Sequence, residues 1–165
     1  MTSLIGGVMK KMLIVFFLVV MSLISYNGLA QSTTLDSQTR GALVAAIDDE
    51  RHAQATYQAV INKFGNVRPF INIIQAEKRH ESALLVLFEK YNVPVPENTW
   101  TPDKIAVPKT LTAACEMSVV AEKANIAMYN QFLDFTKEND IRIVFTNLQS
   151  ASRDNHLRAF RRCAR

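Results

Sequence analysis

The chain has 165 residues, of which 48% are hydrophobic and 21% are charged, with five Gly and five Pro. This length fits one globular domain, and the composition is too apolar for a disordered chain and too poor in Gly and Pro for a fibrous one. Two cysteines exclude a disulfide-dense scaffold and a four-cysteine zinc site. Lys and Arg number 19 and Asp and Glu 15, a net charge of +4.

Residues 1–30 have the pattern of a secretory signal. Lys10 and Lys11 precede an apolar run over 12–24, and a short polar stretch with Gly28 and Ala30 follows. A basic start, an apolar centre and a small-x-small end are typical of a cleaved signal peptide, and the run is shorter than the ~20 residues that usually span a bilayer. We predict cleavage after Ala30, export to the periplasm or the exterior, and no stable membrane association afterwards. An uncleaved N-terminal anchor is the alternative.

The mature chain, residues 31–165, is nearly neutral. Loss of Lys10 and Lys11 leaves 17 basic residues against 15 acidic ones, a net charge of +2. Arginines near the C-terminus fit the negative end of a helix dipole; they are Arg158, Arg161, Arg162 and Arg165. Weak basicity and export together argue against nucleic acid as a partner.

Four segments of the mature chain have apolar residues at helical spacing, over roughly 36–64, 69–91, 110–133 and 141–163. The predicted N-caps are Asp36 or Ser37 for the first segment and Thr110 for the third. Short connections make each sequential pair of helices an antiparallel hairpin.

The middle connection, residues 92–110, is different because it is long and carries four prolines. Its extended length suffices to run back along a helix of about 26 residues, or roughly 40 Å. The sequence therefore predicts an all-α four-helix bundle, with two antiparallel helical hairpins joined by a long crossover.

The two predicted hairpins resemble each other. Residues 50–57 read E-R-H-A-Q-A-T-Y and residues 122–129 read E-K-A-N-I-A-M-Y, so both have Ala at +5 and Tyr at +7 from Glu. His80 and His156 occupy matching places in the second helix of each hairpin. An internal duplication with a pseudo-two-fold axis would bring the mid-helix polar residues together.

Each predicted helix carries a polar residue in the middle of its buried face. These residues are Glu50, Glu77 with His80, Glu122 and His156. A buried carboxylate is costly unless it is paired or binds a cation, and residues three apart, such as Glu77 and His80, project to one side of a helix. Carboxylate and imidazole suit iron, manganese or zinc. We therefore predict that these five residues bind one or two metal ions.

With these residues the mature chain resembles the ferritin-like superfamily and, within it, an uncharacterised ferritin-like family of bacteria and archaea. The residues that carry the resemblance are Glu50 with Tyr57, 68–80, 122–129 and 155–160. In ferritin-like di-iron proteins the first and third helices each supply Glu, and the second and fourth each supply Glu-x-x-His. The resemblance implies a ferritin-like bundle over 31–165, an iron centre, and oxidation of ferrous iron or reduction of oxygen or peroxide.

One position departs from that pattern. Arg153 stands three residues before His156, where the family has Glu, and Asp154 would point away from His156 on an α-helix. The centre is thus one carboxylate short, which weakens the inference of oxygen-activating di-iron chemistry more than it weakens the fold. We expect the Arg153 guanidinium to pair with a buried glutamate and to replace the charge of one cation.

The remaining aromatic and polar candidates have simpler interpretations. Tyr57 and Tyr129 are predicted to lie in the core with their hydroxyls bonded to the ligand carboxylates. His52 lies off the buried face and is predicted to be solvated. Cys115 and Cys163 lie at adjacent ends of a hairpin, so in an oxidising compartment we predict a disulfide. A redox-active pair, which lacks C-x-x-C spacing, and two separate thiols are the alternatives.

Two classes of function are open from the sequence. The first is an exported metal-binding protein, with redox turnover or with plain sequestration. The second is a non-catalytic helical binding or structural module, whose metal-free core holds an ionic network of Arg153 with the three glutamates. The sequence marks no subunit interface, so it implies no ferritin-type shell and leaves a homodimer open.

Overall fold

The computed structural model describes residues 34–165, and every regular element in this range is helical. The predicted signal over 1–30 lies outside the described residues. Within them, no helix has both the length and the apolar character that crossing a bilayer requires. The elements in chain order are α1 (Ser37–Phe64), α2 (Phe70–Lys90), the 3₁₀ helix η1 (Pro102–Lys104), α3 (Leu111–Phe135), α4 (Asn139–Ala151), the π-helical turn η2 (Ser152–His156) and α5 (Leu157–Cys163).

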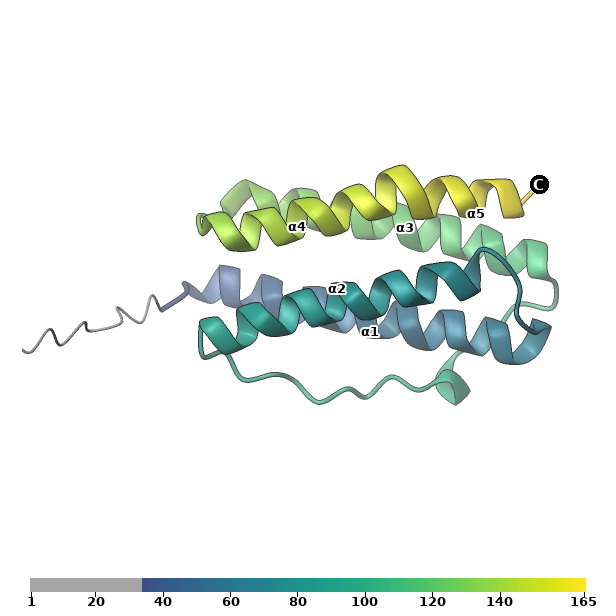
Figure 1. Cartoon of the computed structure of the whole chain (residues 1–165), viewed down its shortest axis with the longest axis horizontal. Coiled ribbons are helices and arrows are strands. Elements are labelled where there is room, and N and C mark those ends of the chain that lie inside the picture. The colour runs from purple at the N-terminus through teal and green to yellow at the C-terminus, as the bar shows by residue number, and fades with distance from the viewer. Residues whose placement is uncertain (1–33) are drawn as a thin grey trace, which may run out of the picture. The chain divides into compact units, whose positions relative to one another are not determined.

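The helices form two antiparallel hairpins joined by a long crossover, which confirms the predicted four-helix bundle (Figure 1). The first hairpin packs α1 against α2, and the second packs α3 against the continuous run of α4, η2 and α5. The crossover returns along the length of the bundle, so α3 starts at the same end as α2 (Figure 1).

The helix boundaries follow from local hydrogen bonding. The Asp36 carboxylate accepts from the Thr39 backbone N–H at 2.8 Å, and the Thr110 hydroxyl oxygen accepts from the Ala113 N–H at 3.2 Å. Each cap satisfies an N–H group that has no partner inside its helix. At the other end of α1, Gly65 has a φ of +83°, a conformation that glycine adopts without strain. Both predicted N-caps are confirmed, with Asp36 rather than Ser37 at α1.

Side chains of α1 hold the crossover against the bundle. The buried Arg51 donates to the Pro96 carbonyl at 2.7 Å. Trp100 donates from Nε1 to Asp48 Oδ1 at 2.9 Å, and its ring lies on that of His52 with 4.3 Å between centroids. His52 is exposed, as predicted. The crossover is therefore fixed in place next to the middle of α1.

The apolar core consists of two clusters separated by a polar layer. Along α1, Leu43 and Ile47 belong to the first cluster, Tyr57 and Val60 belong to the second, and Glu50 lies between them. The first cluster also contains Leu84, Leu87, Phe88, Ile141, Phe145 and Leu148, and the second contains Phe70, Ile73, Ile74, Cys115 and Phe160. Each fully buried large apolar side chain contributes about 1.5–3 kcal/mol. The polar layer is thus closed off from water on two sides.

The fourth predicted helix is not an α-helix throughout. Its middle is the π turn η2, in which the Leu157 N–H bonds to the Ser152 carbonyl, five residues earlier. A π turn holds one more residue than an α turn. The expectation of an uninterrupted α-helix over 141–163 is wrong at this point, and side chains before His156 point in directions that α-helical spacing does not predict.

The predicted disulfide between Cys115 and Cys163 is confirmed. It joins the start of α3 to the end of α5, with 5.7 Å between the two Cα atoms. Both cysteines of the chain are thereby paired. Such a bond is consistent with an oxidising compartment.

Reduction of this disulfide, or the change Cys163→Ser, should lower the melting temperature by roughly 10–15 °C. The bridged residues are 48 apart in sequence, and the lost loop constraint corresponds to about 4 kcal/mol. Thermal unfolding followed by circular dichroism measures the change. The Cys115→Ser/Cys163→Ser variant is the control, since reductant should not alter its melting temperature. An unchanged melting temperature after complete reduction of the native chain would contradict the prediction.

Candidate metal centre

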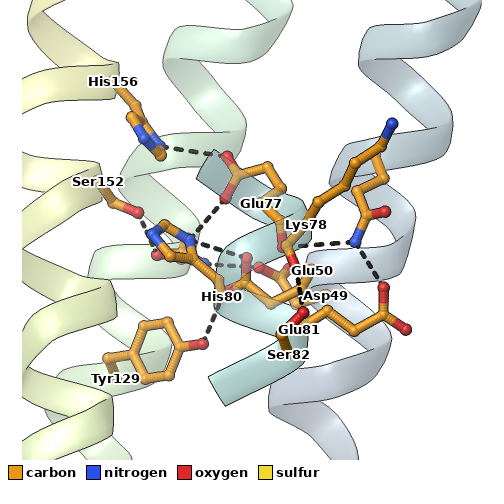
Figure 2. Close-up of polar contacts among 12 residues, drawn as sticks. Asp49, Glu50, Glu77, Lys78, His80, Glu81, Ser82, Tyr129, Ser152 and His156 are labelled. Atoms are coloured by element: carbon orange, nitrogen blue, oxygen red, sulfur yellow. Dashed lines mark hydrogen bonds and ion pairs between the residues drawn. The ribbon is translucent and has the colours of Figure 1, made fainter. Parts of the chain in front are cut away.

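Four segments of the bundle place carboxylates and imidazoles at one level of the core, and Figure 2 shows Glu50, Glu77, His80 and His156 among them. Glu50 comes from α1, Glu77 and His80 from α2, Glu122 from α3, and His156 from η2. The three glutamates and His156 have exposed fractions of only 2–4%, and the His80 side chain is 14% exposed. The structure therefore brings the five predicted ligands together in a layer that is largely buried.

Glu77 lies between the two imidazoles (Figure 2). Its Oε2 is 2.8 Å from Nδ1 of His80, and its Oε1 is 3.1 Å from Nδ1 of His156. His80 Nδ1 is also 3.2 Å from Glu50 Oε2, and His156 Nδ1 is 3.5 Å from Glu122 Oε1. The centre thus has two similar halves, each with a glutamate and a histidine, which share Glu77.

The Nδ1 atom of His156 is buried and has no hydrogen-bond partner. The nearby oxygens of Glu77 and Glu122 are close to it, but neither lies in a direction that suits a hydrogen bond. These oxygens balance the charge of a protonated ring, but a neutral ring has an unbonded Nδ1, and a buried polar atom without a hydrogen bond costs about 1–3 kcal/mol. A cation bound at this atom would remove that cost.

The donor atoms fit a transition metal. Glu77, His80 and His156 each present a ligand atom, and these atoms lie within 4.8 Å of one another. This buried group can hold a metal ion. Imidazole and carboxylate donors suit several divalent transition metals, and the carboxylates of Glu50 and Glu122 lie beside this group.

Two tyrosines fix the outer carboxylates. The Tyr57 hydroxyl on α1 donates to Glu122 Oε1 on α3, and the Tyr129 hydroxyl on α3 donates to Glu50 Oε1 on α1, each at 2.8 Å. Burial, together with the neighbouring carboxylates, raises the pKa of both tyrosines, so their hydroxyls stay protonated. Tyr57 and Tyr129 occupy the predicted positions, where hydrogen bonds to ligating carboxylates would orient them.

Protons balance part of the charge of the polar layer when no metal is bound. Burial raises the pKa of Glu50 to about 8, despite the neighbouring His80. Burial also opposes the charged forms of the histidines, but the carboxylates beside them outweigh it and raise the pKa of His80 to about 9 and of His156 to about 10. The two imidazoles likewise outweigh burial at Glu77 and hold its pKa well below the usual range. The layer then contains imidazolium and carboxylate in contact.

The expectation that Arg153 pairs with a buried glutamate is wrong. The Arg153 side chain is 52% exposed, and it donates to Asp154 Oδ2 at 2.9 Å. The extra residue in η2 explains the difference, because Ser152 instead of Arg153 shares the buried face with His156. The predicted ionic network around Arg153 is therefore absent from the described layer, and the histidines are the cationic partners in it.

A hydrogen-bonded chain beside the centre is missed by the sequence interpretation. Ser152 donates to Asn125 Oδ1 at 2.7 Å, and Asn125 Nδ2 donates to Asp49 Oδ2 at 2.6 Å. Burial raises the pKa of Asp49. The available signal was Asn125, which lies three residues after Glu122 and so shares its helix face. Asp49 gave no signal, because an acidic residue next to Glu50 is usually on a solvated face.

No protein-family model matches the chain. The chain is 27% identical over 140 residues to the uncharacterized protein MJ0754 of Methanocaldococcus jannaschii, with 76% of this chain and 75% of that protein aligned. The crystal structure of that hypothetical protein is similar at a TM-score of 0.71, with 79% of this chain and 81% of that chain covered. The two proteins are homologous.

Arg153→Glu should add no metal ligand, although it restores the Glu-x-x-His spacing. The π turn directs residue 153 to solvent, so the substitution changes only surface charge. Anaerobic titration with ferrous iron should give the same number of bound ions per chain as the native protein. Arg153→Ala controls for the lost positive charge. An additional ion bound by Arg153→Glu alone would show that residue 153 reaches the centre.

Proposed function

We propose that the protein binds iron in the core of its bundle, as one or two ions held by Glu50, Glu77, His80, Glu122 and His156. The observation that carries the proposal is the position of Glu77, with one carboxylate oxygen facing each imidazole. A carboxylate between two nitrogen donors can be shared by two ions, with Glu50 and Glu122 completing the two halves. The donor set also suits manganese or zinc, and two imidazoles with a carboxylate occur in both non-haem iron and zinc sites.

Charge compensation supports the same conclusion. Three carboxylates share a layer in which each is at most 4% exposed, and burying a charge is strongly unfavourable unless it is paired. A divalent or trivalent cation compensates several carboxylates at once. It would also give the buried His156 Nδ1 a partner, which that atom lacks.

Bound iron would supply redox chemistry, so the reactions that we propose are oxidation of ferrous iron and reduction of oxygen or peroxide. The residues around the centre prepare the site for this role. Tyr57 and Tyr129 orient the outer carboxylates, and the two apolar clusters exclude water from two sides. The disulfide and the signal-like N-terminal sequence support a periplasmic or secreted location.

A metal-free structural or binding module is the competing function. It is favoured by the direct His80–Glu77 and His80–Glu50 contacts at 2.8 and 3.2 Å, which pair the charges without a metal. Plain sequestration of iron is a third outcome. Metal analysis of protein purified without an affinity tag separates the first two functions. Aerobic titration with ferrous iron, followed by absorbance, distinguishes turnover from sequestration.

Glu77→Gln should reduce iron binding by more than about tenfold. The substitution keeps the shape of the side chain but replaces one of the oxygens that face the imidazoles with an amide nitrogen. Metal analysis and the anaerobic dissociation constant for ferrous iron measure the loss. Glu89→Gln is the matched control, because Glu89 is an exposed glutamate on the same helix. If Glu77→Gln retains native iron content and affinity, the proposed site is wrong.

Metal affinity should rise by at least about tenfold per pH unit between pH 6 and pH 8. The pKa values of about 9 for His80 and about 10 for His156 mean that both imidazoles are protonated in this range. Each must lose its proton to ligate a metal, so raising the pH favours binding. Calorimetric titration with Zn²⁺, a redox-silent probe, in buffers of different ionisation enthalpy counts the protons released. A pH-independent affinity without proton release would contradict ligation by these histidines.

A further inference from the structure

A cavity of ≈ 280 Å³ lies directly beside the candidate centre. Side chains of α1 and α3 line it, and Trp100 and residues 104–106 of the crossover contribute the rest of its outer wall. Its lining includes the carboxylate side chains of Glu50, Glu77 and Glu122, while the two imidazoles are not part of it. The cavity therefore gives a small molecule access to the carboxylate side of the centre.

The walls of this cavity are mostly apolar. Ala53 comes from α1, Met117 and Ala121 come from α3, and Trp100 and Ile105 come from the crossover. A concave, mainly apolar site with a few polar groups is the usual form of a small-molecule site. Burial of a hydrocarbon body against these side chains would favour binding by about 25 cal/mol per Å² of apolar surface.

One polar group in the cavity lacks a partner. The Thr56 side chain is only 9% exposed, and its Oγ1 atom is buried without a hydrogen bond. The other hydroxyl and amide side chains of the lining are hydrogen-bonded. Ser152 donates to Asn125, Asn125 donates to Asp49, Ser118 donates to the Ala114 carbonyl, and Tyr57 donates to Glu122. Thr56 lines the cavity, and rotation of its side chain would bring this buried hydroxyl to the cavity surface, where a ligand oxygen would satisfy it.

The charge at the inner end of the cavity selects against ionised ligands. A carboxylate or phosphate would face four acidic side chains, those of Asp49, Glu50, Glu77 and Glu122. The one lysine of the lining, Lys104, is exposed and already donates to the Thr99 carbonyl. An ammonium group would lose its hydration among apolar walls, and its attraction to the glutamates is weakened because the imidazoles or a bound metal ion already balance them. An uncharged molecule avoids both costs.

We infer that the cavity binds a small uncharged organic molecule, with an apolar body against the crossover and one hydroxyl or carbonyl oxygen at Thr56. This placement puts the molecule against the carboxylates of the centre. Its role as the substrate of that centre rests on the iron-binding function proposed above. Its binding to the cavity is independent of that function and can be measured on the metal-free protein.

Trp100 provides the measurement, because it lines the cavity and is the single tryptophan of the chain. The probe is cyclohexanol, which is transparent where tryptophan is excited and carries one hydroxyl on an apolar ring. It should change Trp100 fluorescence saturably at about millimolar concentration. Cyclohexanecarboxylate and cyclohexylammonium, its charged analogues, should bind at least tenfold more weakly.

Two substitutions test the position of the probe. Thr56→Val keeps the side-chain shape and removes the hydroxyl, so cyclohexanol should bind about three- to tenfold more weakly. Ala106→Phe places a ring at an exposed cavity residue and should abolish the saturable signal. Ala127→Phe, at an exposed α3 residue outside the cavity lining, is the matched control and should bind as the native protein does.

The inference is overturned if cyclohexanol gives no saturable change, if Ala106→Phe or Thr56→Val binds it as tightly as the native protein, or if either charged analogue binds more tightly than cyclohexanol. Metal analysis of the same samples decides the iron-binding function separately. If the protein binds cyclohexanol in the cavity but takes up no iron, the ligand site is supported. The proposal that the bound molecule is a substrate of an iron centre is then wrong.

Discussion

The burial of three carboxylates in one layer is the constraint on which the rest of the structure depends. An unpaired buried carboxylate costs several times the roughly 1 kcal/mol that a typical hydrogen bond contributes. Glu50 accordingly meets a tyrosine and a histidine, Glu77 meets two histidines, and Glu122 meets a tyrosine and a histidine. Because the imidazole nitrogens that face these carboxylates can bind either a proton or a metal, the two ways of balancing the layer exclude each other. Because protons and a metal ion would compete for the same imidazole nitrogens, these residues can be buried without a metal and could still bind one.

The crossover covers one lateral side of this layer and forms the outer wall of the cavity beside it. Apolar clusters close it along the bundle axis, and the cavity opens on its lateral side, where residues of α1 and α3 face the crossover. Arg51 supplies the anchor, since it donates to Pro96 of the crossover at 2.7 Å and pairs with Glu81 of α2 at 2.7 Å. One buried guanidinium thus connects the crossover to both helices of the first hairpin. The crossover is long enough to run the length of the bundle, which is why the sequence predicts two hairpins. The same length allows it to cover the site.

The fold and the grouping of the five polar residues could be predicted from the sequence. Helical spacing and the caps at Asp36 and Thr110 are local signals, and a glutamate on an otherwise apolar helix face conflicts with burial strongly enough to stand out. The contacts around the centre could not be predicted, because they depend on how segments far apart in the sequence pack against one another. The partner of Arg51 and the contact between Trp100 and His52 depend on the path of the crossover. The free hydroxyl of Thr56 marks a site only once the cavity around it is known. The direction of Arg153 depends on a change of helix type that residue spacing does not encode.

That change of helix type also explains why the centre has the donors that it has. The buried positions Ser152, His156 and Phe160 follow one another in steps of four, and on an α-helix each such step turns a side chain by about 40° around the axis. The π turn absorbs this rotation, so His156 faces Glu77 while Phe160 returns to the apolar cluster with Tyr57 and Phe70. The same turn moves the residue three before His156 out to solvent. The arginine at position 153 therefore lies outside the polar layer. Three carboxylates and two imidazoles are the side chains that the four segments bring into contact in this layer.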